Sequence, residues 1–269
     1  MDNDRSHDNL KEQDYLKDMP NHEFDEAVNT MQSSIQDEIA ASTDLLGDKL
    51  DISMLKNEYS ADDVQYQKKI QNLEKRYSHV RKTRGDGNCF FRAFGFGYLE
   101  HMLSDKKDYP IFQENASNSF QKLMDLKYPS FTVEDFFENF ISVVNSVKEG
   151  VSHTELLNTF REEGMSNYFV VYLRLITSCQ LQSDSDFYQN FIDGGKTLVE
   201  FCKTEVEPMY LESDHIHIIA LTSALGACVR VAYMDRGGDD LSFHDFPEDS
   251  QPTLHLLYRP GHYDVLYPR

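Results

Sequence analysis

The chain of 269 residues carries its helical patterns before its strand patterns, and this order limits the folds open to it. Apolar residues recur at helical spacing from about Ser60 to beyond Thr197, whereas alternating apolar residues come later, at Val229–Tyr233 and on both sides of Arg259–Gly261. Runs of helices followed by strands are typical of α+β proteins. We therefore predict an α+β fold in which helices surround a small, late β-sheet.

Short polar signals mark the starts of the predicted helices. A capping box pairs a hydroxyl with an acidic residue three positions later, so that both satisfy free N–H groups of the first turn. Four pairs have this spacing: Ser60 and Asp63, Thr132 and Asp135, Ser152 and Glu155, and Thr197 and Glu200. Behind the first pair, an apolar stripe extends the predicted helix to Tyr77.

One cysteine follows a loop that contains two glycines. Cys89 comes directly after Gly85-Asp86-Gly87-Asn88, and Asn88 is a suitable N-cap for an amphipathic helix that begins at the cysteine. The partial positive charge of a helix N-terminus favours a thiolate, and glycines let backbone N–H groups converge on a developing oxyanion. These features predict that Cys89 is a nucleophile.

A predicted hairpin supplies a base for this thiol. Leu254–Tyr258 and His262–Tyr267 alternate like strands, and Arg259-Pro260-Gly261 forms the turn between them. Side chains two residues apart in a strand share a face, so Asp264 can hydrogen-bond one nitrogen of His262 while the other nitrogen faces a thiol. Cys89, His262 and Asp264 thus predict a nucleophile, a base and an orienting carboxylate.

Several stretches resemble the OTU-type deubiquitinating cysteine proteases, and among them the otubains. The resemblance extends from about Asp25 onward and is carried by the two motifs above and by three further segments: Gly85–Ala93, Gly261–Asp264, Tyr168–Leu175, Val206–Met209 and Glu212–Leu221. It implies a papain-like OTU fold that hydrolyses isopeptide bonds between ubiquitin units, with a preference for lysine-48-linked chains. It implies no cofactor and no metal.

The resemblance also places Asp86 in the active site, where the backbone N–H groups of Asp86, Gly87 and Cys89 would form an oxyanion hole. Taken alone, an aspartate between two glycines is more often a turn residue whose side chain bonds nearby backbone N–H groups. We favour this mechanical role for the Asp86 side chain. The direct partner of His262 is then Asp264.

Two binding surfaces follow from the same resemblance. A distal ubiquitin would lie near Phe187, Phe191, His215 and His217, and a ubiquitin-conjugating enzyme would lie near Thr132 and Asp135. The two histidines also have alternative roles as metal ligands, or as surface and capping residues. Because no cysteine or third ligand stands beside them, we predict no metal site there.

The chain before the catalytic domain divides into two predicted parts. Residues 1–20 are polar and acidic, without the apolar content that ordering requires, and are expected to be a disordered tail. Residues 21–47 form an amphipathic arm whose stripe includes Phe24, Met31 and Ile35. Periodicity allows this arm to dock on its own domain or on a partner, and the resemblance favours ubiquitin as that partner. Residues 48–269 are the predicted OTU catalytic domain.

Composition excludes several classes of protein. The formal net charge is −20, with 46 acidic against 26 basic residues, which disfavours binding to nucleic acid. No apolar run is long enough to span a membrane, and no signal segment opens the chain. The cysteines lack zinc or redox spacing, so we expect a reducing compartment, the cytoplasm and also the nucleus. We expect Cys179, Cys202 and Cys228 to be buried. We also expect the protein to be a monomer.

Two other functions remain open from the sequence. The resemblance implies one of them, in which the chain acts without catalysis as an inhibitor that binds ubiquitin-conjugating enzymes directly. The chain could also be a general papain-type peptidase, although a narrow groove for the ubiquitin tail argues against that. The partners that the resemblance implies are ubiquitin, polyubiquitin and ubiquitin-conjugating enzymes.

Overall fold

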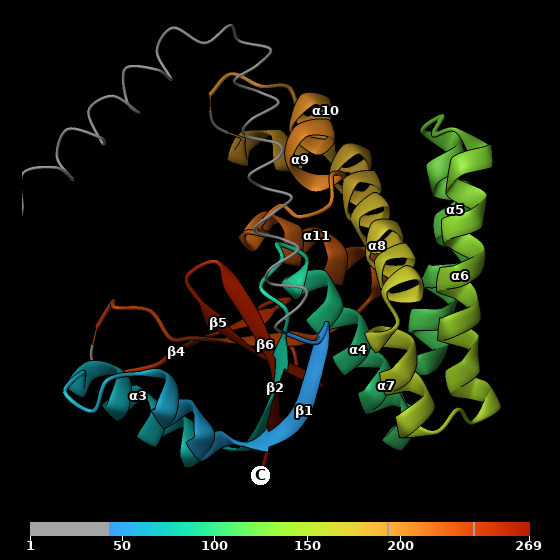
Figure 1. The fold of residues 1–269 in the computed structure, drawn as a ribbon. Helices are drawn as coiled ribbons and strands as arrows, with labels where there is room; N and C mark the ends of the chain where they lie inside the picture. Colours follow the sequence, from blue (N-terminus) through green and yellow to red (C-terminus); the bar gives the residue numbers. More distant parts are fainter. Residues whose placement is uncertain (1–42, 193, 239) are drawn as a thin grey trace, which may run out of the picture. The chain divides into compact units, whose positions relative to one another are not determined.

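A computed structural model describes residues 43–192, 194–238 and 240–269 (Figure 1). The described chain from Asp44 to Arg269 forms one α+β unit. The predicted tail and the predicted contact residues Phe24, Met31 and Ile35 lie outside the described residues. The predicted start of the catalytic domain at residue 48 stays a prediction; the compact unit begins at Asp44, and residue 48 lies in its first strand.

The described chain contains helices of very different lengths. The α-helices are α3 (Val64–Glu74), α4 (Cys89–Ser104), α5 (Tyr109–Asp125), α6 (Ser130–Glu149), α7 (His153–Arg161), α8 (Glu163–Ser183), α9 (Ser185–Tyr188), α10 (Leu198–Phe201) and α11 (His215–Leu225). The 3-10 helices are η1 (Ile52–Glu58) and η2 (Gln189–Phe191), and η3 (Cys202–Val206) is a π-helix.

A six-stranded sheet runs through the unit in the order β1-β2-β6-β5-β3-β4. Its strands are β1 (Leu46–Asp51), β2 (Tyr77–Thr83), β3 (Val229–Tyr233), β4 (Ser242–Phe246), β5 (Leu254–Arg259) and β6 (His262–Pro268). Among the strand pairs of the described residues, only β3 and β5 are parallel. The late strands β3, β5 and β6 were predicted, whereas the early β1 and β2 were not. Tyr77, predicted to end a helix, instead begins β2.

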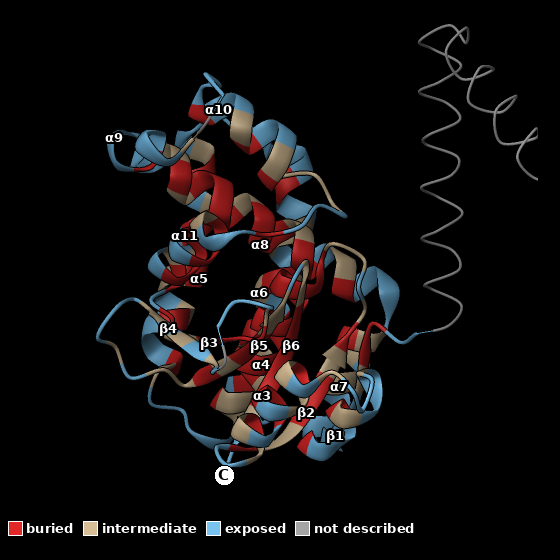
Figure 2. Cartoon of the chain, turned by 90° about the vertical axis from the view of Figure 1, so that its left-hand side faces the viewer, coloured by how far each residue is buried: buried red, intermediate tan, exposed pale blue. Residues whose placement is uncertain are grey.

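The two faces of the sheet are covered by different elements. Apolar residues of α3 and η1, including Ile70, Leu73 and Leu55, pack on one face. The helix α4 packs on the other face and is itself enclosed by α6, α7 and α8. Figure 2 shows buried residues concentrated in α4, α8 and the central strands. The helix α4 is therefore buried on nearly every side, and its predicted amphipathic character is wrong.

The capping signals were confirmed in two of four places. Ser152 with Glu155 and Thr197 with Glu200 form complete capping boxes at the starts of α7 and α10. In α3 the N-cap is Asp63, whose side chain accepts from the backbone of the helix, so the start predicted at Ser60 is too early. Thr132 lies inside α6, which begins at Ser130 after a proline, so its predicted capping role is wrong.

No helix in the described part of the chain combines the length and the apolar character that crossing a bilayer requires.

Candidate active site

The predicted nucleophile lies at a helix start, as the sequence pattern indicated. Cys89 is the first residue of α4 and is 3% exposed, and Asn88 occupies the N-cap position. The Asn88 side chain, however, makes no capping hydrogen bond. Its Oδ1 atom instead accepts hydrogen bonds from Arg174 (2.9 Å) and from the backbone N–H of Tyr210 (3.0 Å). The residue before the nucleophile is thus tied to two distant parts of the chain.

Arg174, in the middle of α8, holds the nucleophile loop. Its guanidinium donates to the carbonyl oxygens of Gly87 (2.9 Å), Leu211 (2.8 Å) and Val206 (3.0 Å), besides Asn88. Burial lowers the pKa of Arg174 to about 10, which leaves the group charged at neutral pH. One buried cation therefore ties the nucleophile loop to the backbone of Val206 and Leu211.

The loop needs glycine at position 87. Gly87 has φ of 76°, a conformation that side chains rarely adopt. A Cβ atom there would lie 2.3 Å from the carbonyl oxygen of Tyr210. The loop and the segment around Tyr210 therefore approach each other more closely than any other residue would allow.

The Asp86 side chain has the mechanical role predicted for it. Its Oδ1 atom accepts from the backbone N–H of Asn88 (2.9 Å), and both carboxylate oxygens lie 3.0 Å from Arg92. Arg92 is fully buried and also donates to Ser166 and Asn167 of α8. The carboxylate is thus used within the loop. An oxyanion hole formed by the N–H groups of Asp86, Gly87 and Cys89 remains a prediction.

The predicted base and its orienting carboxylate meet at the start of β6. His262 and Asp264 share a face of the strand, and Nε2 of His262 lies 2.8 Å from Oδ1 of Asp264. The other ring nitrogen, Nδ1, faces the nucleophile loop, since a Cβ atom at Gly85 would lie 3.6 Å from it. Cys89 also acts on this ring, because its hydrogen bonding and charge raise the pKa of His262.

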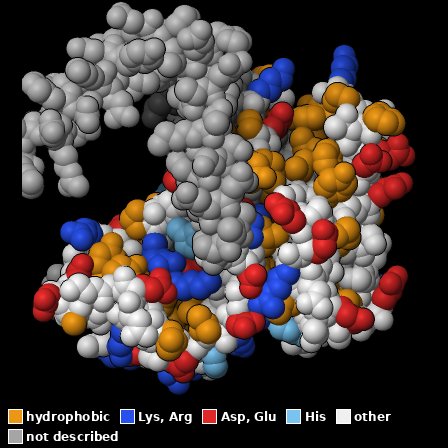
Figure 3. Space-filling model, in the orientation of Figure 1, with side chains coloured by type: hydrophobic (Ala, Val, Ile, Leu, Met, Phe, Trp, Pro, Cys, Tyr) orange, Lys and Arg blue, Asp and Glu red, His pale blue; other side chains and the backbone are white. Residues whose placement is uncertain are grey.

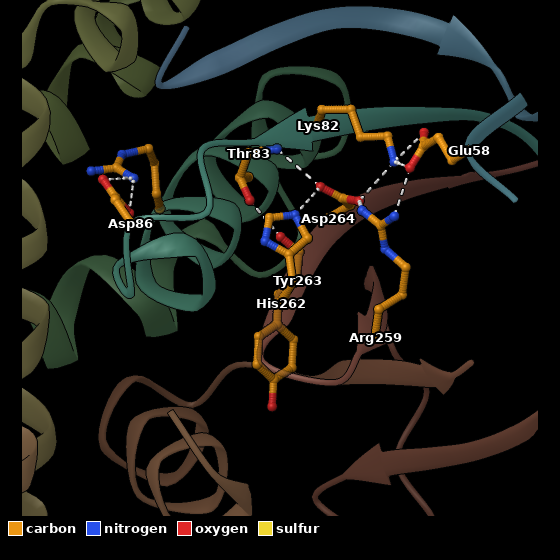
Figure 4. Close-up of polar contacts among 9 residues, drawn as sticks. Glu58, Lys82, Thr83, Asp86, Arg259, His262, Tyr263 and Asp264 are labelled. Atoms are coloured by element: carbon orange, nitrogen blue, oxygen red, sulfur yellow. Dashed lines mark hydrogen bonds and ion pairs between the residues drawn. The ribbon is translucent and has the colours of Figure 1, made fainter. Parts of the chain in front are cut away.

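Three further groups donate to the Asp264 carboxylate, which has no exposed surface (Figure 4). Oδ1 also accepts from the backbone N–H of Thr83 (3.0 Å), and Oδ2 accepts from Arg259 (2.5 Å) and Lys82 (3.3 Å). Glu58 of η1 binds both cations, each at 2.7 Å. Figure 3 shows basic and acidic side chains side by side over β2 and β6. We call Glu58, Lys82, Arg259 and Asp264 the charge network.

Asp264 and Cys89 set the protonation of the predicted base. Burial by itself lowers the pKa of His262, but hydrogen bonds and charges from Asp264 and Cys89 outweigh burial and raise it to about 9. Burial likewise raises the pKa of Asp264, yet His262, Arg259 and Lys82 together hold it well below its usual range. At neutral pH the carboxylate is ionised and the imidazole holds a proton.

Comparison with known proteins identifies the family. The family model described as Peptidase C65 Otubain matches residues 38–268. The chain belongs to the otubain family of cysteine peptidases. It is 49% identical to ubiquitin thioesterase OTUB1 of Homo sapiens over 245 residues. The matched region covers 91% of this chain and 90% of that protein.

Other matches agree with this assignment. An Arabidopsis thaliana protein named OVARIAN TUMOR DOMAIN-containing deubiquitinating enzyme 1 is 41% identical, over 88% of this chain and 85% of its own. A solved complex of h/ceOTUB1 with ubiquitin aldehyde and UBC13~Ub is 36% identical and has a TM-score of 0.86, over 91% of this chain and 99% of that one. The predicted OTU fold and otubain resemblance are thus confirmed.

The surfaces predicted for distal ubiquitin divide into exposed and buried residues. Phe187 and Phe191 are 54% and 59% exposed, and their rings lie 5.2 Å apart. His215 is also exposed and contacts the ring of Tyr233. His217 is only 2% exposed, and its Nδ1 accepts from the N–H of Asp214 at the start of α11. His217 is therefore a capping residue, and a direct surface contact there is wrong for this otubain.

The surface predicted for a conjugating enzyme lies at the start of α6. Thr132 and Asp135 are both exposed, and Phe131 beside them is 84% exposed. On the adjacent helix α8, Met165 and Tyr168 are 39% and 47% exposed. Hydrophobic side chains also gather over the helical layer on the face shown in Figure 3.

The remaining cysteines of the otubain are mostly inert. Cys179 and Cys202 are buried as predicted, and burial raises the pKa of both thiols, that of Cys202 to about 11. Cys228 is only partly buried, so the same prediction is wrong for it. Among these side chains, none has the environment that Cys89 has.

Sequence reasoning missed Arg174 and the cations of the charge network. Arg259 had a usable signal, because it pairs with His262 across the predicted turn and so shares a face with it. Lys82 had none, since β2 was not recognised as a strand. Arg174 sits in a helix whose apolar pattern gives no reason for a buried charge.

Proposed function

We propose that this otubain is a deubiquitinase that hydrolyses isopeptide bonds at the carboxyl terminus of ubiquitin through Cys89, His262 and Asp264. The observation that carries the proposal is the juxtaposition of a buried thiol at a helix start with a His262–Asp264 pair of 2.8 Å. Relatives named ubiquitin thioesterase, and one solved with ubiquitin aldehyde, support ubiquitin as the substrate.

The first chemical step is attack on the carbonyl carbon of the terminal glycine of ubiquitin. His262 takes the proton of the Cys89 thiol, and its pKa of about 9 lets it hold that proton while the sulfur attacks. The resulting oxyanion faces the N–H groups of Asp86, Gly87 and Cys89, in a loop that Arg174 keeps in place.

In the following steps His262 acts first as an acid and then again as a base. His262 gives its proton to the departing lysine amine, and the tetrahedral intermediate collapses to a thioester on Cys89. His262, now neutral, takes a proton from water, which attacks the thioester and releases ubiquitin. Asp264 keeps the imidazole in one orientation throughout, because its carboxylate is held by Thr83, Arg259 and Lys82.

We further propose a preference for lysine-48-linked chains. Exposed Phe187, Phe191 and His215 support a distal ubiquitin contact away from the thiol. The test incubates the protein, and Cys89→Ser as control, with a panel of differently linked diubiquitins and with unfolded casein. Cleavage of the lysine-48-linked dimer alone is expected. Cleavage of casein would favour a general peptidase, and equal cleavage of all linkages would refute the preference.

A second function, inhibition of ubiquitin-conjugating enzymes without catalysis, is favoured by the exposed surface at Phe131, Thr132 and Asp135. Solved relatives bound to UBC13~Ub and UBCH5B~Ub support it. We expect Cys89→Ser to retain inhibition and Thr132→Arg to lose it. Glu114→Arg, on the exposed side of α5, is the matched control and retains it. Loss of inhibition in Cys89→Ser would rule this function out.

The predicted arm is tested by deletion of residues 1–40, which leaves the unit that begins at Asp44. Labelling of Cys89 by a thiol-reactive ubiquitin probe should persist. Cleavage of diubiquitin and inhibition of a ubiquitin-charged conjugating enzyme should weaken. Loss of probe labelling and of cooperative melting would make the arm part of the core, and unchanged diubiquitin cleavage would exclude contact with the proximal ubiquitin.

We propose the cytoplasm, and also the nucleus, as the location of the protein. All four cysteines are free thiols, which suits a reducing compartment. Fractionation of cells with antibody detection tests this proposal, and recovery in a secretory fraction would contradict it.

A further inference from the structure

A cavity of about 500 Å³ lies far from Cys89 and His262, at the opposite ends of the elements that carry them. The last turns of α4, the start of β5 and the end of β6 form its walls, together with the connection from α6 to α7. The end of β6 and the helix α7 both lie in the lower part of Figure 1. This volume falls in the range of small-molecule sites.

The charges around this cavity are unlike those of the chain as a whole. Lys49 and Lys106 line it, and neither ammonium group has a carboxylate within 4 Å among the described residues. The Lys49 ammonium lies 3.8 Å from the centre of the Tyr267 ring, which also lines the cavity. Two uncompensated cations thus face one opening in a protein of net charge −20.

Glu100, the one acidic residue of the described cavity wall, is already occupied. It accepts a hydrogen bond from Tyr267 (2.6 Å), lies 3.5 Å from buried Arg81 and contacts His153. Arg81 is 2% exposed and also donates to the Tyr267 hydroxyl. The charge of Glu100 is therefore balanced from inside the protein, and the cavity keeps the positive charge of its two lysines.

Much of the remaining wall is apolar, and its polar members are His101, Ser104, His153, Thr253 and His255. Val147 and Val151 line one side, and Leu254 and Val265 line the other. Gly97 of α4 stands between them, where a Cβ atom would lie 2.6 Å from Leu254. A ligand that fits such a wall carries a compact apolar body and an anionic head. Burial of the body favours binding, and the head gains two cationic partners.

We propose that this cavity is a second binding site, separate from the active site, for a small organic anion whose carboxylate or phosphate group pairs with Lys49 and Lys106. The apolar part of the ligand lies against Val147, Leu254 and Val265. The proposal is independent of ubiquitin hydrolysis, because the cavity wall includes neither Cys89 nor His262 nor any residue of the charge network.

The test is calorimetric titration of the full chain with phenyl phosphate, benzoate and benzyl alcohol. We expect both anions to bind at one site and the neutral alcohol to bind at least about tenfold more weakly. Tighter binding of phenyl phosphate identifies a phosphate head, and tighter binding of benzoate identifies a carboxylate head. Equal binding of the alcohol would overturn the proposal.

Variants locate the site. Lys49→Gln with Lys106→Gln should weaken anion binding at least about tenfold while leaving melting and ubiquitin-probe labelling unchanged. Lys107→Gln with Lys122→Gln removes the same charge away from the cavity and should bind as the natural chain does. Equal weakening in the control pair would reduce the effect to general charge. Ligand-induced amide NMR shifts are expected at Gly97 and Tyr267, and shifts confined to Gly87 and Asn88 would overturn the proposal.

Discussion

The two halves of the active site are held in different ways. The nucleophile loop is fixed by Arg174, a fully buried cation whose partners are neutral carbonyl and amide oxygens. The base is fixed by the charge network, in which every partner is ionised and Glu58 is 37% exposed. The nucleophile loop therefore depends on hydrogen-bond geometry alone. The position of His262 depends also on the protonation states of its partners. A change of pH should act on the second half only.

The largest expected effect comes from removing the base. His262→Ala should lower kcat/KM for a fluorogenic ubiquitin substrate by about 10²–10⁴-fold, the usual contribution of a positioned acid or base. Asp264→Ala should cost less, because the imidazole remains present. Circular dichroism confirms the fold of both variants. Near-normal turnover in His262→Ala would remove that residue from the mechanism.

Removal of Arg174 tests the other half. Arg174→Ala leaves several buried carbonyl oxygens without a donor and should destabilise the protein by about 3 kcal/mol or more, measured by urea unfolding. Arg174→Lys restores the charge but not the planar set of donors, so it should recover only part of the loss. If both variants were as active and as stable as the natural chain, the loop would not depend on Arg174.

The pH dependence of stability should separate the halves. The folded-state pKa of His262, about 9, lies above the value of about 6.5 expected when the chain is unfolded. Its contribution is therefore complete below pH 6.5 and is lost as the pH rises to 9, by at most about 3 kcal/mol. Unfolding of the natural chain and of His262→Gln across this range checks the prediction. A slope of the same size in the variant would assign it to other groups.

The smallest effects should come from the outer members of the charge network, with opposite signs. Arg259→Gln removes a cation and should raise the pKa of His262, whereas Glu58→Gln removes an anion and should lower it. The second shift should be smaller, because Glu58 is partly exposed and solvent screens its charge. NMR titration of the His262 ring measures both. Shifts in the same direction would mean that the network acts through structure rather than charge.

Local signals made part of the site predictable. A glycine loop before a helix start identified Cys89, and a turn between alternating residues placed His262 and Asp264 on one face. The strand β2 gave no such signal, because Tyr77–Thr83 is rich in polar residues and becomes a strand only by pairing with β1 and β6. The charge network depends on β2 and η1, so most of it was invisible from local patterns.

The helical layer shows the same distinction. Ser152 and Thr197 cap helices through residues three positions away, and both were foreseen. Arg174 acts through backbone groups from two remote segments, Gly87 and Val206–Leu211, which no spacing rule connects. The buried surroundings of α4 were missed for the same reason, since its outer side is covered by helices that come later in the chain.

The pairing of β2 with β6 has a consequence for synthesis of the protein. The ribosome makes Cys89 and its apolar helix long before it makes His262, and nearly all the helical layer is translated in between. Contacts between such distant segments form slowly, because a long loop must close first. A nascent chain therefore carries a thiol without its base, together with exposed edges of β1 and β2. The active site is complete only when the last hairpin, β5 and β6, pairs with β2.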